Sequence, residues 1–166
     1  TVEQGVRDLA DFLHMLGNPV GVISAGNSQS LERFLDLNYP LSILDVQRTM
    51  AVCAEDGAAA VILALSEETL NDDALQSVNV DVLGCDDKGL SEAEIVKSVA
   101  RFGCTVGKQT HIAGRTQESD ALAAQATEAY GQTDSSALSL SIAMVLAAGV
   151  RKANIKSALR VSRDLN

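Results

Sequence analysis

The feature that most constrains the fold is an uninterrupted apolar run, Ala-Ala-Ala-Val-Ile-Leu-Ala-Leu, at residues 58–65. A strand covered on one face alternates apolar and polar side chains, whereas a strand buried on both faces reads as a continuous apolar run. Strands of the second kind are typical of parallel sheets that carry helices on both faces. The run therefore predicts an α/β protein built around a largely parallel sheet.

Strand and helix patterns alternate along the rest of the chain. Residues 2–16 carry apolar side chains at helical spacing, and a Gly-Asn-Pro turn at 17–19 separates this helix from a short apolar strand at 20–23. Ser91 and Glu94 form the S-x-x-E capping box that begins another helix. Further strands are predicted at 41–46, 78–83, 105–106 and 110–113, the last two as edge strands or a hairpin, and further helices at 31–35, 49–56, 66–69, 121–130, 135–148 and 153–161.

We predict a single domain over residues 1–166, a length that suits one hydrophobic core. Its expected fold is a doubly wound, mainly parallel sheet with helices on both faces, a three-layer P-loop-like or Rossmann-like arrangement, and a helical C-terminal end. Because the chain begins with Thr1 rather than Met, a fragment of a longer protein is one interpretation. Right-handed crossovers would bring loops 24–30, 65–69 and 84–89 to the carboxyl edge of the sheet, where ligands bind in such folds.

Composition excludes several classes of partner. The chain has 13 Lys and Arg against 22 Asp and Glu, a net charge of −9, which leaves no basic surface for nucleic acid. Its apolar runs are far shorter than the roughly 18 residues of a membrane-spanning helix, and no signal peptide is visible. Three widely spaced cysteines argue against a disulfide framework. We therefore expect a cytoplasmic protein without nucleic-acid or membrane partners, for which a small anionic ligand or a nucleotide is a candidate.

A small polar loop follows the first strand and forms the first candidate site. The helix predicted after it would offer free backbone N–H groups and a positive dipole end to a phosphate. Two glycines have the separation of P-loop glycines, but Asn-Ser stands in place of Lys-Ser/Thr. The alternative is a tight strand-to-helix turn capped by a serine. The candidate phosphate-binding residues are Gly26, Asn27, Ser28, Gln29 and Ser30.

Polar residues that follow two later strands form a second candidate site. Ser66, Glu67 and Asp86 are candidate ligands for Mg²⁺, because carboxylates at adjacent strand ends can hold this ion together with water and phosphate. The alternative is an acidic, solvated surface, which is the usual setting of charged loop residues.

A third group surrounds the strand predicted at 110–113. Lys108, His111 and Arg115 cluster there, and His111 is a candidate acid–base group because an unperturbed imidazole titrates near neutrality. No carboxylate or nucleophile is tied to His111 by spacing, so a structural or surface histidine is the alternative.

Several of these segments also carry longer motifs in a fixed order. A helix and turn at 7–19 lead into Gly-Val-Ile-Ser-Ala-Gly-Asn-Ser at 21–28, followed by an Ser-Glu-Glu-Thr-Leu segment within 61–70. This order resembles the central, ATP-binding domain of the Mur ligases, where a strand runs into G-T-N-G-K-[ST]-T and a later segment reads E-[VA]-S-S-x-x-L. Residues 78–83, 136–138, 147–150 and 155–159 are similar to the next strand and the helical end of that domain.

The resemblance implies one domain of a three-domain enzyme that joins an amino acid to a carboxylate through an acyl-phosphate. That chemistry uses ATP and Mg²⁺, mostly on UDP-linked peptidoglycan precursors, and the partners would be other domains or subunits of a ligase-like protein. Four functional positions differ from the family pattern. The P-loop lysine falls on Ser28, or on Gln29 with a shift of one residue, and the Mg²⁺-binding glutamate falls on Ala64. The family's histidine is missing from residues 84–90, and Ser136 replaces an asparagine.

Three hypotheses follow from these observations. The first is a Mur-ligase-like central domain with a decayed nucleotide site, which acts as a scaffold, regulatory or partner-binding module, because phosphoryl transfer depends on the charges that are missing. The second is an active ATP-dependent acid–amino acid ligase with a rearranged site. The third is an unrelated Rossmann-like module that binds a small anionic ligand at residues 24–30.

Overall fold

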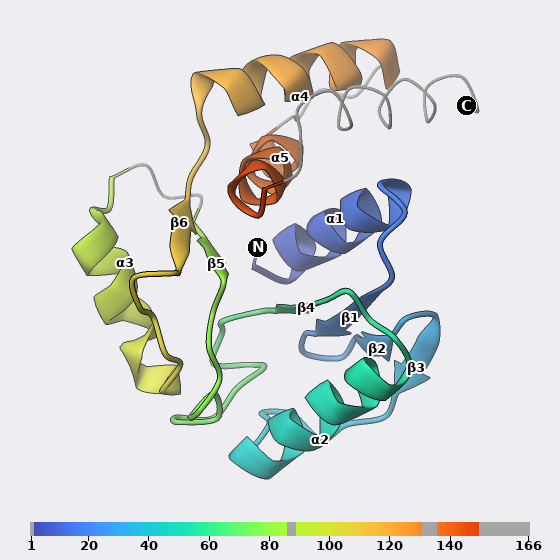
Figure 1. Cartoon of the computed structure of the whole chain (residues 1–166), viewed down its shortest axis with the longest axis vertical. Helices are drawn as coiled ribbons and strands as arrows, with labels where there is room; N and C mark the ends of the chain where they lie inside the picture. The colour runs from blue at the N-terminus through green and yellow to red at the C-terminus, as the bar shows by residue number, and fades with distance from the viewer. Residues whose placement is uncertain (1, 86–88, 131–135, 150–166) are drawn as a thin grey trace.

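The structure is a computed structural model that describes residues 2–85, 89–130 and 136–149. Helices and strands are interspersed along the chain in a mixed α/β fold (Figure 1). The helices are α1 (Val2–Met15), α2 (Ile43–Glu55), α3 (Glu92–Val99), α4 (Gln117–Tyr130) and α5 (Ser136–Ala147), with a 3₁₀ turn, η1 (Ala100–Phe102). The strands are β1 (Val20–Ile23), β2 (Ser28–Ser30), β3 (Arg33–Leu35), β4 (Ala60–Leu63), β5 (Val82–Gly84) and β6 (His111–Ala113).

The strands of the described residues form two small sheets. The first has the order β3-β2-β1-β4, in which β1 and β4 are parallel while β1, β2 and β3 are joined by antiparallel pairing. The second is the parallel pair β5-β6. The expectation of a mixed α/β fold is confirmed, but the predicted continuous, mainly parallel sheet is replaced by a mixed sheet and a separate strand pair.

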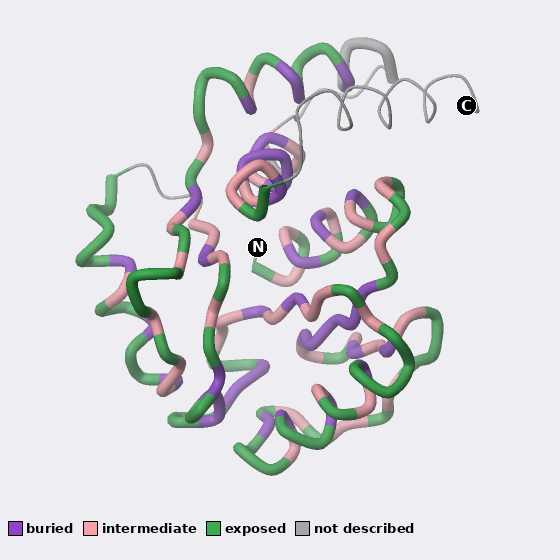
Figure 2. Tube along the Cα trace, in the orientation of Figure 1, coloured by how far each residue is buried: buried purple, intermediate pink, exposed green. Residues whose placement is uncertain are grey.

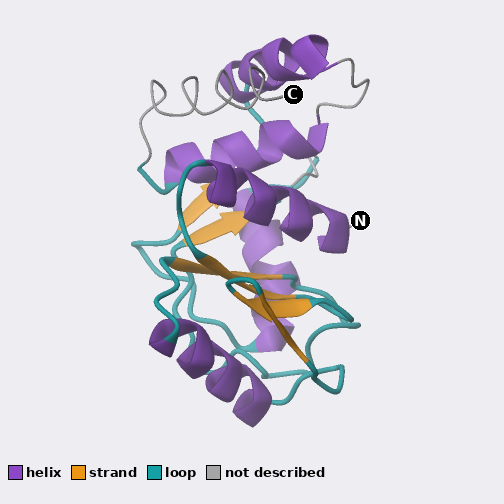
Figure 3. Ribbon diagram, turned by 90° about the vertical axis from the view of Figure 1, so that its right-hand side faces the viewer, coloured by secondary structure: helices purple, strands orange, loops and turns teal. Residues whose placement is uncertain are grey.

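Helices cover both faces of the first sheet. Helix α1 contacts β1 and β4, whereas α2 contacts β1 and β2 from the opposite side (Figure 3). Helix α5 packs on α1 and on the second sheet, and α4 packs on α5. Phe12, Val22 and Ile142 lie in the apolar cluster that joins these helices to the sheet, and buried positions follow β1 and the inner sides of α1 and α5 (Figure 2).

The helix predicted at 31–35 is wrong, because this segment belongs to a β-hairpin. Ser30 and Arg33 face each other across β2 and β3, so a two-residue turn joins the strands, and Leu31 adopts a positive φ of 57° within it. The helical spacing of Leu31, Phe34 and Leu35 suggested a helix, but two of these side chains are placed by strand alternation instead. Phe34 is consequently exposed rather than buried against the sheet.

The strand predicted at 41–46 is also wrong, because α2 begins at Ile43. Ser42 caps the helix: its Oγ accepts a hydrogen bond from Asp45 N–H at 3.2 Å, and Asp45 Oδ2 accepts one from Ser42 N–H at 3.1 Å. This reciprocal box satisfies two otherwise unpaired donors at the helix start. The Ser42 hydrogen bonds also hold the pKa of the Asp45 carboxyl below its usual value.

Smaller differences concern the remaining elements. Residues 66–69 form a turn and not a helix, and β6 pairs with β5 in parallel rather than in a hairpin with residues 105–106. The capping box at Ser91 and Glu94 is confirmed at the start of α3. The helices predicted at 121–130 and 135–148 correspond to α4 and α5, and the helix predicted at 153–161 lies outside the described residues.

Candidate functional site

The carboxyl ends of β1 and β4 meet at one edge of the first sheet. The two strands are in parallel register from Val20 opposite Ala60 to Ile23 opposite Leu63, and Ala64 N–H donates to Ile23 O at 2.9 Å. The expectation that the loops after these strands meet at the carboxyl edge is confirmed for the start of 24–30 and for 65–69, because Ala25 N–H donates to Thr69 Oγ1 at 2.9 Å. Residues 28–30 form β2, which runs back along β1, and the segment predicted at 84–89 follows β5 in the second sheet and lies partly outside the described residues. The segments that carry the predicted phosphate ligands and two of the predicted metal ligands, Ser66 and Glu67, therefore begin at this edge.

Buried hydroxyl groups fill this edge. Thr69 is fully buried, and its Oγ1 lies 3.0 Å from the Ser66 hydroxyl, which also donates to Glu3 Oε1 on α1 at 2.9 Å. Ser66 is thus held by the first turn of α1 and by its own loop. The hydroxyl that was predicted as a metal ligand donates its proton within the fold and lies against a second hydroxyl.

Replacing Thr69 with valine is expected to lower the free energy of unfolding by about 1–3 kcal/mol. Valine keeps the shape of threonine but leaves the Ala25 N–H without its acceptor at a buried position. Thr69→Ser is the control, because it keeps the hydroxyl and loses only a methyl group, worth about 0.8 kcal/mol. Equal losses for the two variants in urea denaturation would contradict the role given to the hydroxyl.

The two serines of the predicted phosphate loop are buried in β2 and bonded within the fold. Ser28 Oγ accepts a hydrogen bond from the Tyr39 hydroxyl at 2.7 Å and donates to Ser24 O at 3.3 Å. Ser30 Oγ donates to Asp56 Oδ2 at 2.6 Å, on the side of the sheet that α2 covers. This bond, followed by the one from Arg33, holds the pKa of the Asp56 carboxyl below its usual value.

The three other residues of the predicted phosphate loop remain accessible at the surface. Gly26 is exposed with a φ of 75°, and Asn27 closes the turn through a bond from its N–H to Ser24 O at 3.0 Å. Gln29 Nε2 donates to Asn27 Oδ1 at 3.1 Å. The predicted site geometry is wrong, because a strand and not the N-terminus of a helix follows this loop, so no row of helix-start N–H groups faces residues 26–30.

The two predicted metal ligands that the structure describes, Ser66 and Glu67, are bonded to different groups of the fold. Glu67 Oε1 accepts a charge-assisted bond from Arg101 Nη1 at 2.5 Å, while Arg101 Nη2 donates to Asp72 Oδ1 at 3.1 Å. The Glu67 contact, followed by that of Asp72, raises the pKa of the Arg101 guanidinium. Asp86 lies outside the described residues. Among the residues that the structure does describe, no three His, Cys, Asp or Glu side chains are placed to hold one metal ion.

The predicted basic group takes separate positions along the β6 segment. Lys108 is exposed in the turn before β6, and His111 is exposed at the start of that strand. Arg115 Nε donates to Asp120 Oδ1 at 3.0 Å, and this carboxylate also accepts a bond from Ser139 Oγ at 2.6 Å. Arg115 thereby contributes to a polar network between α4 and α5, which gives it a structural role.

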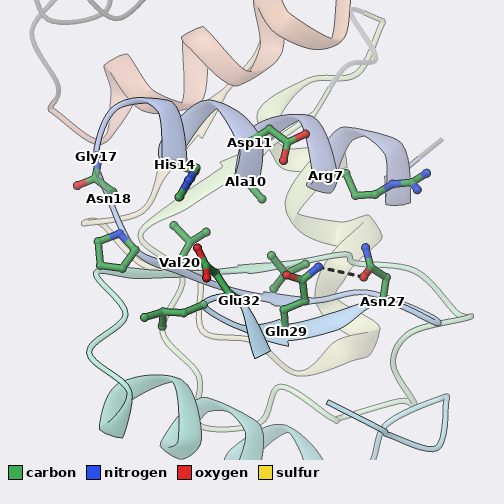
Figure 4. A pocket seen from close by; sticks show the side chains of 13 residues that line it. Arg7, Ala10, Asp11, His14, Gly17, Asn18, Val20, Asn27, Gln29 and Glu32 are labelled. Carbon is green, nitrogen blue, oxygen red and sulfur yellow. Dashed lines mark hydrogen bonds between the residues drawn. The ribbon is translucent and has the colours of Figure 1, made fainter. Parts of the chain in front are cut away.

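A hollow at the surface of the described residues is a groove that sequence reasoning missed. It lies between α1 and the β2–β3 hairpin and has a volume of about 710 Å³ (Figure 4). Arg7, Asp11 and His14 come from successive turns of α1, and this spacing was the available sequence signal. The hairpin supplies the opposite wall. The full lining is Arg7, Ala10, Asp11, His14, Gly17, Asn18, Pro19, Val20, Val22, Asn27, Gln29, Leu31 and Glu32.

Comparisons with known proteins identify no family for this chain. No family model, no curated protein sequence and no solved structure matches this chain. Within the described ranges, no helix has both the length and the apolar character needed to cross a membrane.

Proposed function

We propose that this chain is a Mur-ligase-like central domain that does not turn over ATP and acts in the cytoplasm as a scaffold or regulatory module. The observation that carries the proposal is the β2–β3 hairpin, which occupies the position where the family resemblance requires a phosphate loop and a helix. Phosphoryl transfer depends on donors and charges arranged around the phosphates. A hairpin with buried serines does not offer that arrangement.

The hydrogen bonds around the loop support the same proposal. Ser28 and Ser30 are each about 1% exposed, and both hydroxyls are bonded to groups of the fold. A phosphate would have to displace those bonds, and breaking a buried bond without replacement costs about 1–3 kcal/mol per group. Glu67, one of the predicted Mg²⁺ ligands, is already paired with Arg101.

The finer architecture is part of the proposal. Two parallel pairs, β1–β4 and β5–β6, and helices on both faces of the first sheet support a doubly wound, three-layer arrangement with an antiparallel hairpin added at one edge. In this interpretation the partners are other domains or subunits of a larger ligase-like protein.

The proposal is tested by titrating the chain with Mg·ATP and following its melting temperature together with phosphate release. We expect no saturable shift and no turnover. A nucleotide at 100 times its Kd would stabilise a binding-competent chain by about 2.7 kcal/mol, which for a protein of this size is a rise of roughly 5–10 °C.

Saturable stabilisation with hydrolysis at an ordinary kcat, about 1 s⁻¹ or more, would overturn the proposal in favour of an active ligase. An Asn27→Ala, Gln29→Ala double variant locates any nucleotide effect, since both side chains are accessible and lie beside the predicted phosphate loop. Leu44→Ala is the matched control, because Leu44 is exposed at the start of α2, far along the chain from that loop.

A further inference from the structure

Within the described residues, part of the first sheet carries no helix on the side of α1. Val22, Gln29 and Phe34 face one another across β1, β2 and β3, so their side chains share one face of the sheet. Val22 is 5% exposed beneath α1, Gln29 is half-buried, and Phe34 is 71% exposed. The cover that α1 gives to β1 therefore ends at β2, and the face of the hairpin is open.

The groove runs along this boundary, and part of its lining is apolar. Ala10, Val20, Val22 and Leu31 contribute carbon surface to it. Phe34 is the cross-strand neighbour of Gln29, which lines the groove, so its ring is on the same face of the sheet, one strand beyond the lining residues. Of the large apolar side chains that are exposed, Phe34 has the highest exposed fraction in the described part of the chain. Aromatic side chains in such positions are typical anchors of protein–protein contacts.

The charged residues of the groove divide it into two ends. Asp11 and Glu32 face it from α1 and from the hairpin turn, with His14 beside them (Figure 4). Arg7 lies one turn of α1 further along, where its Nη2 donates to Gln4 Oε1 at 2.9 Å. The part of the groove away from Arg7 therefore carries two carboxylates, with His14 nearest the Gly17–Pro19 turn, and is called its acidic end.

The amide groups of the groove suit an extended chain. Asn27 and Gln29 lie on the floor beneath α1, and their amides can exchange hydrogen bonds with a peptide backbone. From residue 7 to residue 14, α1 rises by about 10 Å, the length of roughly three extended residues.

We propose that this groove binds a short, extended segment of a partner protein in which basic residues flank apolar ones. The apolar side chains of the partner segment lie against the apolar lining and beside Phe34, and a lysine or arginine of the partner segment pairs with Asp11 and Glu32. The charge complementarity of the acidic end selects a basic segment over an acidic one. This inference goes beyond the proposed function and does not rest on it, because a peptide contact along α1 needs no nucleotide, although the groove shares Asn27 and Gln29 with the predicted phosphate loop.

The experiment uses the full chain and a fluorescein-labelled peptide, Gly-Lys-Leu-Leu-Lys-Gly, blocked at both ends, with fluorescence anisotropy as the readout. The comparison peptide is Gly-Glu-Leu-Leu-Glu-Gly. We expect the basic peptide to bind with a Kd on the order of 100 μM, as suits a small contact, and a rise in salt to about 0.5 M to weaken it severalfold. The acidic peptide is expected to bind at least tenfold more weakly.

Variants assign the binding to the groove. The double variant Asp11→Asn, Glu32→Gln is expected to weaken binding of the basic peptide at least fivefold, and Phe34→Ala at least threefold. All three residues are exposed, so melting curves check that each variant folds. Leu44→Ala, which removes an exposed apolar side chain at the start of α2, is expected to leave the Kd unchanged.

Three results would overturn the inference. The first is no saturation by the basic peptide up to about 1 mM, a concentration at which binding carries little specificity. The others are equal binding of the acidic peptide and unchanged binding of the basic peptide by the double carboxylate variant. None of these results depends on the outcome of the nucleotide titration.

Discussion

Replacing Gly21 with alanine is expected to lower the free energy of unfolding by about 2–3 kcal/mol, as overpacking of a tightly packed core does. A Cβ at this position would lie 3.0 Å from Cys53 Cβ and closer still to Cys53 Sγ, with Val61 Cγ2 at 3.5 Å. Gly21 is on the central strand β1, which pairs on both sides, so the backbone has little room to move away. Urea denaturation measures the loss.

The Cys53 thiol is the group that makes Gly21 necessary. Cys53 is fully buried in α2, and its burial raises the pKa of its thiol. The double variant Gly21→Ala, Cys53→Ala removes the sulfur that the new methyl group would meet. We expect its loss of stability to be at least 1 kcal/mol smaller than the sum of the losses of the two single variants, as is found for residues in direct contact. Additive losses would contradict the proposed contact.

Gly84→Ala provides a contrast at the second sheet. A Cβ there would also meet a neighbour within 3.0 Å, but this neighbour is the side chain of Met144 on α5. Methionine has three rotatable bonds and adapts to small changes in its surroundings. The loss of stability should therefore stay below that of Gly21→Ala, because the Met144 side chain that faces Gly84 can move, whereas the strand backbone at Gly21 cannot.

The fold was predictable from the sequence where local pattern and tertiary packing agree. The apolar spacing of α1 and the capping box at Ser91 each lie within one element, and each is confirmed. The apolar run at 58–65 is confirmed as a parallel strand, but the burial on both faces predicted for it is wrong, because β4 is at the edge of the described sheet and only Ile62 of this strand is buried. The β2–β3 hairpin was not predictable in this way. Ser30 can be buried in β2 because its hydroxyl reaches Asp56, which is 26 residues away, and no local pattern carries that information.

The candidate site shows the same division. The meeting of loops 24–30 and 65–69 follows from the parallel pairing of two apolar strands, and it was predicted. What the polar groups do at this edge depends on partners elsewhere: Ser66 bonds to Glu3 on α1, and Glu67 bonds to Arg101. The groove depends on the direction of the hairpin, so its hairpin wall could not be found while residues 31–35 were assigned to a helix.

Helix α1 joins the parts of the molecule, and Phe12 is the side chain through which it does so. Phe12 is 1% exposed and lies in an apolar cluster with residues of β1, β4, α4 and α5. Its replacement by alanine is expected to lower the free energy of unfolding by about 3–5 kcal/mol, because a cavity is left where elements from both ends of the chain meet. Phe12→Leu fills most of that space and should cost distinctly less.

The position of Phe12 also predicts which elements respond. Because α5 packs on α1, the loss of Phe12 should expose α5 amides to hydrogen exchange together with those of α1. Helix α3 lies in the other apolar cluster, which contains Ile95 and Val99, and its amides serve as the internal control. If exchange in α1 and α5 rose no more than exchange in α3, Phe12 would be stabilising the whole chain uniformly and α1 would have no special role in holding α5 to the sheet.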